Sequence, residues 1–459
     1  MENRKAKWRK NIGGRKLKLN ATQIIALSFL GMIVAGTCLL ALPVSSRSGS
    51  SCGIIAALFT ATSATCVTGL SLFDSWTQWS GFGQVVLLCL IELGGLGFMS
   101  AASLVIFVLR KKVDLRQRLL MAQAMSLNEM QSVVRLQKWV LIGSLTIQFT
   151  GTMILLLRFL PEYGLRRAAI WGVFHAVSAF CNGGFDLFGA VAPGQSVMIF
   201  NDDPVVCITL MGLILMGGLG FFVWEEIATK RSFKKCSVYT KLAVLTTLVL
   251  VCGGAVLFLA LEWNNPQTLG NMPVWQKILN AFFQSVTLRT AGFFSIDQGG
   301  LTEAGKVVSI LWMLVGGASG STAGGIKMVT VLVLILFVCS RIRGKSTVNV
   351  FRRRISLEQV MDAMTIASVV IGIGLVGALC ICTTAPISFL DSLYETVSAL
   401  ATVGVTTGIT ATLSVPIQLM LVIFMYFGRV GILTISLGFL MGDKAEERYQ
   451  NAYTNLLIG

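Results

Sequence analysis

The feature that most constrains this chain is a series of apolar runs, each long enough to cross a lipid bilayer. The first, from Ala21 to Pro43, carries no charged residue, and about 20 apolar residues span the ~30 Å of hydrocarbon. Further long apolar runs lie at 82–109, 139–160, 205–228, 242–261, 307–340, 363–386 and 415–442. A soluble core cannot bury so much apolar surface. The sequence therefore predicts an all-α polytopic membrane protein with eight transmembrane helices.

The charges indicate how these helices are oriented. The 459 residues include 37 Lys and Arg against 21 Asp and Glu, a net charge of +16. Of the 37 cations, 28 lie in the N-terminal segment 1–20, in the connections 110–138, 230–241 and 341–354, and in the tail 443–459. Cytoplasmic connections are enriched in Lys and Arg. We therefore expect a cell-membrane protein with a cytoplasmic N-terminus, and no nucleic-acid partner; a basic patch for lipid headgroups is the second interpretation.

Four short apolar segments on the opposite side are too brief to span and end in small residues. Aligned on one glycine, they read SATCVTGL (63–70), SAFCNGGF (178–185), VTLRTAGF (286–293) and SALATVGV (398–405). The aligned glycines are 115, 108 and 112 residues apart, which predicts a unit of about 110 residues that occurs four times. Each segment has the pattern of a re-entrant half-helix. Non-helical backbone at membrane depth is tolerated only where protein buries it or where it lines a water-filled cavity.

A second glycine element follows each of these loops. It reads GGLGF at 94–98 and 217–221, GG at 316–317, and GRVG at 428–431. The loop glycine and the second glycine element therefore recur together, in the same order, four times along the chain. This predicts four concatenated units, each made of a span, a re-entrant pore helix and a span, at residues 21–110, 138–229, 240–340 and 360–442. The alternative for the second element is that its glycines only allow close helix packing.

Four equivalent loops that enter from one side predict a pseudo-fourfold pore. Glycine permits positive φ, so that backbone carbonyls can point at a central axis. Rings of carbonyls replace the hydration shell of a monovalent cation, and half-helices would aim their partially negative C-terminal ends at the same point.

These loops, together with the eight-span plan, resemble the Trk/Ktr/HKT superfamily of potassium transport subunits, and most of all its bacterial KtrB/TrkH type. The resemblance implies a channel-like pore for potassium uptake, in which potassium is the substrate and is held by backbone carbonyls of a selectivity filter. By position, the filter residues are Val67, Thr68, Gly69, Asn182, Gly183, Gly184, Thr290, Ala291, Gly292, Thr402, Val403 and Gly404. Glycine rather than serine at Gly69 favours potassium over sodium, and a single aligned glycine per loop implies looser selectivity than in tetrameric potassium channels.

The sixth apolar run, Val307 to Ser340, is longer than one span requires, and its middle is GGASGSTAGG (316–325). Each glycine costs a helix about 1 kcal/mol, so this stretch predicts an irregular intramembrane loop; a kinked helix is the alternative. The resemblance implies a gate here. The predicted gate residues are Gly316, Gly317, Ser319, Gly320, Gly324, Gly325, Lys327 and Arg429.

Two of these gate residues are charged. Arg429 replaces the second glycine of the repeated element, and a buried intramembrane arginine is a functional hypothesis by default. Lys327 either pins the loop to a lipid or a carboxylate, or snorkels to the membrane surface.

The resemblance also implies partners: a homodimer with the tail 443–459 at its interface, and a cytosolic ring of RCK-type nucleotide-binding proteins of the KtrA/TrkA kind. No cofactor is expected in this chain, and stimulation by sodium stays open. The eleven cysteines are interpreted as small packing residues.

Two other functions compete with the pore. A secondary cation transporter, coupled to sodium or protons, would show inverted repeats and paired broken helices, whereas this sequence predicts parallel units and one broken span. A membrane-embedded enzyme would need a catalytic set. The only histidine is His175, which is expected to be packed or at the surface, so no catalytic residue is predicted.

Three further charged residues are ambiguous in the sequence. Glu92 and Glu395 either shape the electrostatics of the pore or are hydrogen-bonded structural carboxylates. For Arg289 we expect a salt bridge that braces the third loop.

Overall fold

The computed structural model describes residues 21–97, 133–345, 347–350 and 353–431, and these are almost entirely helical. The α-helices are α2 (Ala21–Leu40), α3 (Ile54–Thr65), α4 (Ser75–Gln78), α5 (Gly81–Leu96), α8 (Val133–Cys181), α9 (Pro204–Leu219), α10 (Phe221–Lys230), α11 (Val238–Glu262), α12 (Val274–Thr287), α13 (Glu303–Leu314), α14 (Met328–Ile342), α15 (Leu357–Thr384), α16 (Phe389–Leu400) and α17 (Val415–Val430). The strands β1 (Asn349–Val350) and β2 (Arg353–Arg354) form an antiparallel hairpin. Short 3₁₀ turns are η1 (Pro43–Ser45), η2 (Phe188–Ala190), η3 (Ser196–Phe200), η4 (Phe233–Lys235) and η5 (Thr410–Thr412).

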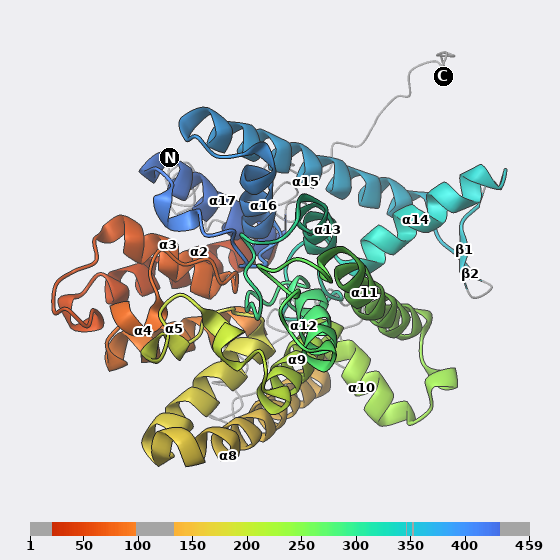
Figure 1. Ribbon diagram of the computed structural model, residues 1–459. Helices are drawn as coiled ribbons and strands as arrows, with labels where there is room; N and C mark the ends of the chain where they lie inside the picture. Colours follow the sequence, from red (N-terminus) through yellow and green to blue (C-terminus); the bar gives the residue numbers. More distant parts are fainter. Residues whose placement is uncertain (1–20, 98–132, 346, 351–352, 432–459) are drawn as a thin grey trace, which may run out of the picture.

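The chain runs around a common centre in sequence order. In Figure 1 the helices α2–α5, α8–α9, α11–α13 and α15–α17 occupy successive sectors, coloured from red through yellow and green to blue. The first and last sectors meet, because α17 packs on α2 and α3, and the Tyr426 hydroxyl donates a hydrogen bond to the Ala26 carbonyl over 2.9 Å.

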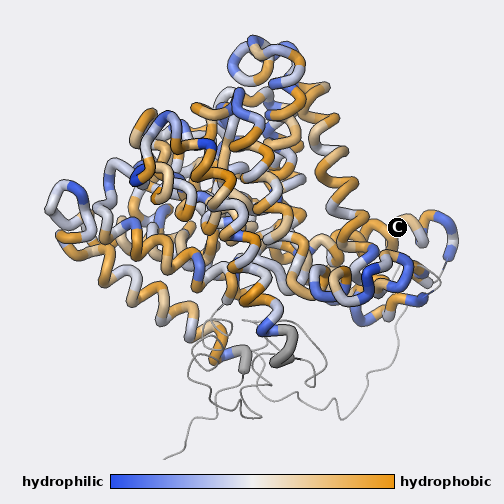
Figure 2. The backbone as a smooth tube through the Cα atoms, turned by 90° about the horizontal axis from the view of Figure 1, so that it is seen from below, coloured by the Kyte–Doolittle hydropathy of each residue, from blue (hydrophilic) through white to orange (hydrophobic). Residues whose placement is uncertain are grey.

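By length and composition, four described helices can cross a membrane: α2, α8, α11 and α15; the bent pair α9 and α10 makes a fifth if it counts as one span. The described parts of the predicted second, sixth and eighth spans are the shorter apolar helices α5, α13 with α14, and α17. Figure 2 shows apolar residues along most of the helices, with hydrophilic residues gathered in connections. The basic segment 1–20, the run beyond Gly97 to residue 132, and residues 432–459 with the predicted interface tail lie outside the described residues.

The predicted half-helices are present as short helices that end just before each aligned glycine. They are α3, α12, α16 and the last part of α8. Helix α8 is two helices in one, since Gly164 adopts φ 72° and ψ 162° and separates the predicted span from the half-helix that follows it. Ser388 caps α16 by accepting the Asp391 amide, and caps of this kind satisfy amides that a helix start leaves free.

The second glycine element allows helices to approach the pore helices closely. A methyl group on Gly94, Gly217 or Gly428 would collide with the carbonyl oxygen of Thr65, Phe180 or Leu400, respectively. Each of these carbonyls lies four residues before an aligned glycine. Close packing therefore explains three of the four elements; in the third, Gly316 faces the Gly324 carbonyl instead.

The structure breaks more helices than the sequence predicts. Helix α9 ends at Gly220 (φ 90°), and α10 leaves at 91° to it. Helices α5 and α17 likewise end at Gly97 (φ 82°) and Gly431 (φ 93°). The prediction of a single broken span is therefore wrong, because α9 and α10 form a second break at Gly220, whose positive φ is a conformation that glycine adopts readily.

The close contacts predict opposite effects for two glycines of α9. Gly217→Ala should lower the midpoint of thermal unfolding in detergent, because overpacking of this kind costs about 1–3 kcal/mol. Gly212→Ala on the same helix meets nothing within 4 Å and should leave the midpoint unchanged or slightly higher. Equal behaviour of the two variants would contradict the packing role of Gly217.

Candidate functional site

The four aligned loops share an unusual backbone conformation. Two residues before each glycine, a non-glycine residue has positive φ: Val67 at 56°, Asn182 at 61°, Thr290 at 68° and Thr402 at 51°. The aligned glycines have positive φ as well, and the residues between do not. Non-glycine residues rarely adopt this region, and strain of this kind concentrates at functional sites.

The loops also form a closed ring. Each aligned glycine faces the next loop, where it lies against the carbonyl oxygen of the residue before that loop's glycine. A methyl carbon added to the glycine would lie 3.0 Å from this oxygen at Gly69 and at Gly184, and 3.1 Å from it at Gly292. The four pairs, in order, are Gly69 with Gly183, Gly184 with Ala291, Gly292 with Val403, and Gly404 with Thr68. The structure thus brings together all four predicted filter segments, at a spacing that only glycine permits.

A hydroxyl six residues before the glycine braces three of the loops. Ser63 and Ser398 each accept the amide of their glycine at 3.1 Å. Ser178 donates to the Phe185 carbonyl over 2.7 Å. The third loop has Val286 at this position, and there Thr287 donates to the Phe293 carbonyl. The serine shared by three loops in the sequence is therefore a structural brace.

A cavity of about 240 Å³ lies on one side of the ring and is lined by the four aligned glycines. Asp74 and Asp186 are the carboxylates in its lining. Asp74 caps α4 and accepts the Gly194 amide over 3.1 Å, so it links α4 to the connection between η2 and η3. Burial and the nearby Asp74 carboxylate raise the pKa of Asp186 to about 7.

On the other side of the ring, residues 315–327 form an irregular loop between α13 and α14. This is the predicted break, and the alternative of a kinked helix is wrong. The amides of Ala318 and Thr322 donate to the Gly218 and Gly217 carbonyls, over 2.9 and 3.2 Å. These are carbonyls that the end of α9 leaves free, so the loop completes the hydrogen bonding of a broken helix.

The predicted gate residues other than Arg429, which lies on α17, are in this loop, and several contact neighbouring elements. Gly316 donates its amide to the Ile326 carbonyl, and Gly317 accepts the Met328 amide. The Ser319 carbonyl accepts the Tyr239 hydroxyl, and the Gly320 carbonyl accepts the Phe221 amide. The glycines Gly324 and Gly325 lie against the start of the fourth ring loop. A methyl group on Gly324 would collide with the Thr402 hydroxyl, and one on Gly325 would lie 3.1 Å from the Ala401 carbonyl oxygen.

Arg429 fastens this loop to another helix. Its guanidinium donates to the Thr322 carbonyl and to the carbonyls of Gly94 and Gly95 at the end of α5. A helix C-terminus is partially negative and favours a cation. Lys327 donates to the Ala323 carbonyl over 2.7 Å, so it pins the loop to itself rather than to a lipid or a carboxylate.

The ambiguous polar residues are now placed. His175 is buried, with Nδ1 at 2.7 Å from the Trp171 carbonyl and Nε2 accepting the Leu187 amide. Glu92 accepts hydrogen bonds from Gln148 and Cys181, and buried Glu395 accepts from Thr406 and Thr410. Both residues are therefore hydrogen-bonded carboxylates with a structural role, the second of the two interpretations given above.

Arg289 corrects an expectation. It is 3% exposed, its guanidinium donates to Thr247 over 3.3 Å, and none of the ion pairs among the described residues includes it. The expected salt bridge is therefore wrong. The loop is linked through backbone instead, because the Asn182 amide group donates to the Arg289 carbonyl.

Two residues at the loop were missed in the sequence. The Thr322 hydroxyl donates to the Phe180 carbonyl over 3.1 Å and lies 3.4 Å from the side-chain oxygen of Asn182, so it joins the loop to the second of the four ring loops. Tyr239 reaches the loop from α11. Thr322 sits within a conspicuous glycine run, but nothing in the sequence near Tyr239 singles it out.

Comparison with known proteins gives one consistent result. The family model TrkH, described as a cation transport protein, matches residues 6–448. The chain is 37% identical over 447 residues to the potassium/sodium uptake protein NtpJ of Enterococcus hirae, covering 96% of this chain and 98% of that protein. It is 36% identical over 433 residues to the Ktr system potassium uptake protein B of Bacillus subtilis, covering 94% and 96%. The potassium transporter TrkH from Vibrio parahaemolyticus has the same fold, with a TM-score of 0.72 over 92% of this chain and 85% of that one at 17% identity.

The bonds of Arg429 predict a local effect of its removal. Arg429→Gln should speed hydrogen exchange of the amides of residues 316–325 about tenfold or more, because the loop loses charge-assisted hydrogen bonds. Arg343→Gln, which removes an exposed cation at the far end of α14, is the matched control. Unchanged exchange in the Arg429 variant would mean that the bonds to α9 alone hold the loop.

Proposed function

The chain belongs to the TrkH family of cation transport proteins, and we propose that it is the pore-forming membrane subunit of a Ktr-type potassium uptake system. Members of this family are transporters rather than enzymes. The observation that carries the proposal is the closed ring of four loops, in which each aligned glycine lies against a carbonyl of the next loop. Rings of backbone carbonyls can replace the hydration shell of a potassium ion.

The twelve residues of the ring are proposed to be the selectivity filter, and the loop 316–325 with Lys327 and Arg429 the gate beneath it. The loop contacts the filter segments from the inner side through Thr322 and Gly324. Arg429 adds a positive charge there, which opposes the passage of a cation. An ion that leaves the filter inward meets this loop first.

The finer architecture is part of the same proposal. Four concatenated units, at 21–110, 138–229, 240–340 and 360–442, supply eight spans around the pore, in a cell-membrane protein with a cytoplasmic N-terminus. Relatives are named as parts of a Ktr system, which supports a regulatory partner. The proposed assembly is a homodimer on a cytosolic nucleotide-binding ring, with sodium as a stimulating ion.

A sodium- or proton-coupled transporter is the second candidate, and the break between α9 and α10 favours it more than the sequence did. Broken helices occur at the ion sites of such transporters. The orientation of the loops argues against it, since all four pore helices end at one ring. Coupled transporters of that kind are built from inverted units.

Rubidium uptake into proteoliposomes separates the two candidates. A pore should admit rubidium down its own gradient, with no sodium or proton gradient imposed, and Arg429→Ala should raise this basal flux several-fold because a charge barrier is removed. Uptake that stops when the sodium and proton gradients are dissipated would support the coupled transporter. Adding a candidate ring subunit with nucleotide then tests regulation.

Gly69 predicts the effect of a side chain in the filter. Gly69 has φ 101°, and a Cβ atom at this position would lie 3.0 Å from the Gly183 carbonyl oxygen. A serine here costs about 1–2 kcal/mol of conformational free energy and displaces that carbonyl. Gly69→Ser should therefore lower the rubidium-to-sodium flux ratio about fivefold or more. Gly53→Ser is the control, because Gly53 also has positive φ (87°) but meets nothing within 4 Å. A ratio unaltered by Gly69→Ser counts against the filter assignment.

Asp186 predicts a pH dependence of uptake. With its pKa raised to about 7, the carboxyl is ionised above that pH and neutral below, so acidifying the outer side from pH 8 to pH 6 removes a negative charge from the cavity. Rubidium influx at low concentration should fall with this change, and Asp186→Asn should show low influx at both pH values. Asp297→Asn, an exposed carboxylate outside the cavity, should retain the wild-type profile; the same profile in Asp186→Asn would refute the role of Asp186.

A further inference from the structure

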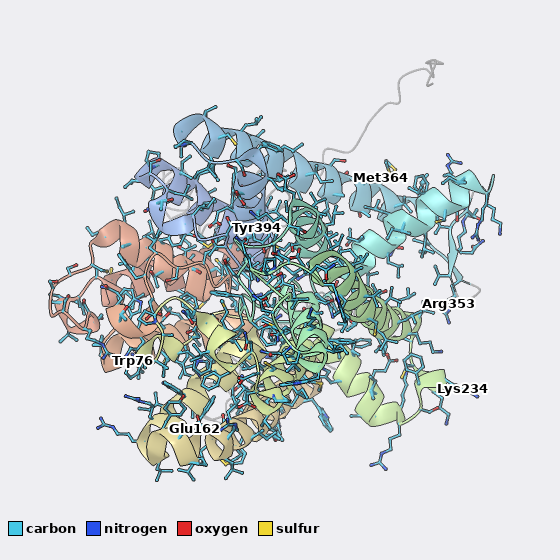
Figure 3. All side chains as sticks on the ribbon, in the orientation of Figure 1. Trp76, Glu162, Lys234, Arg353, Met364 and Tyr394 are labelled. Carbon is cyan, nitrogen blue, oxygen red and sulfur yellow. The ribbon has the colours of Figure 1, made fainter. Side chains whose placement is uncertain are left out.

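A second cavity, of about 410 Å³, lies away from the ring, between α11, α14, α15 and the β1–β2 hairpin. Its wall is largely apolar and includes Leu242, Val333 and Ile366, while Arg353, Arg354 and Asp362 line its polar part. Arg353 is labelled at the outer edge of the molecule in Figure 3. The cavity includes the first turns of α11 and α15, two of the helices that can span a membrane, which places it at the level of one membrane surface.

The charge of this region is positive. Arg353 and Arg354 are exposed, and the ion pairs found among the described residues include neither of them. Two guanidinium groups and one carboxylate give the polar part of the cavity a net positive charge. The last turn of α14, which contains Arg341, precedes the β1–β2 hairpin by a few residues and adds a further cation. Guanidinium groups bind phosphate oxygens in a bidentate manner.

The apolar wall decides between a dissolved anion and a lipid. Inorganic phosphate would use the arginines and leave the apolar wall without a partner, whereas a phospholipid fills both. The neighbouring outward faces of α14 and α15 are apolar, with Ile335, Val338 and Val376 more than half exposed, as expected for surfaces covered by acyl chains. Basic pockets between membrane helices bind anionic headgroups.

We propose that an anionic phospholipid binds in this cavity, with its phosphate at Arg353 and Arg354 and an acyl chain along Leu242, Val333 and Ile366, and that it regulates the loop 316–325. The regulatory part rests on the gate function proposed above. The binding part does not depend on it.

The connection to the loop is direct. Tyr239 lines the cavity, and its hydroxyl donates to the Ser319 carbonyl over 2.9 Å. Val329 and Thr330 line it from the first turn of α14, which begins where the loop ends. A ligand stabilises the conformation that it binds. Since the cavity coexists here with the loop held beneath the filter, the bound lipid favours the blocked state.

Lipid binding is tested on the purified full chain by native mass spectrometry after reconstitution with phosphatidylglycerol or phosphatidylcholine. Retention of phosphatidylglycerol should fall about 25-fold in Arg353→Gln/Arg354→Gln, since each of the two cations near a membrane surface contributes roughly a fivefold gain in affinity. Lys234→Gln/Lys235→Gln removes the same charge from exposed η4 residues outside the cavity and should retain the lipid. Val333→Trp should lose it by filling the apolar wall while leaving every charge in place.

Three results would overturn the site. Equal losses in the two double variants mean non-specific attraction to the surface, and equal retention of both lipids means no headgroup recognition. Complete displacement by millimolar inorganic phosphate assigns the arginines to a dissolved anion. Thermal unfolding of each variant in detergent verifies that it is folded.

Regulation is tested by rubidium uptake in the same two lipids. Phosphatidylglycerol should lower basal uptake of the wild-type protein several-fold, and the double arginine variant should lose this difference. Tyr239→Phe keeps the ring in the cavity but removes the bond to Ser319, so it should retain the lipid while its uptake no longer depends on it. Retained lipid with equal uptake in both wild-type preparations would overturn the regulation and leave the site; absence of uptake under every condition would reject the proposed function instead.

Discussion

The structure depends on one constraint: backbone groups inside an apolar environment must find partners within the protein. Helices that cross without a break satisfy this by themselves, whereas a helix that stops at membrane depth leaves its last carbonyls free. Here those carbonyls are used. The end of α9 accepts amides from the loop 316–325, and the end of α5 accepts the guanidinium of Arg429. Helix breaks, loop and arginine are therefore parts of one hydrogen-bonded arrangement.

Glycine makes this arrangement possible at two depths. In the ring, Gly404 lies so close to the Thr68 carbonyl that no side chain fits. Below it, Gly94, Gly217 and Gly428 let the helices touch the carbonyls at the ends of the pore helices. Glycine thus allows both the close approach of the four loops to one another and the close packing of the helices that hold them.

The four loops of the ring could be predicted from the sequence because their pattern occurs four times in register. The irregular loop 315–327 could be predicted because its glycine run is unsuited to a helix. Contacts between distant segments could not. Nothing near Arg429 indicates that it bonds to Thr322 and to the end of α5, and the absence of a carboxylate near Arg289 is a property of its surroundings in space. The break at Gly220 was missed because the glycines of GGLGF (217–221) are equally compatible with close packing of a continuous membrane helix.

The contact of α17 with α2 has a consequence for how the protein is made. The ring closes between Gly404 and Gly69, and Tyr426 fastens the last described helix to Ala26 on the first. A nascent chain that has inserted three sectors therefore has an open seam along the centre, with polar backbone exposed to lipid. Completion of the ring is tied to synthesis of the final sector, so a chain that terminates early exposes polar backbone that membrane quality control can recognise.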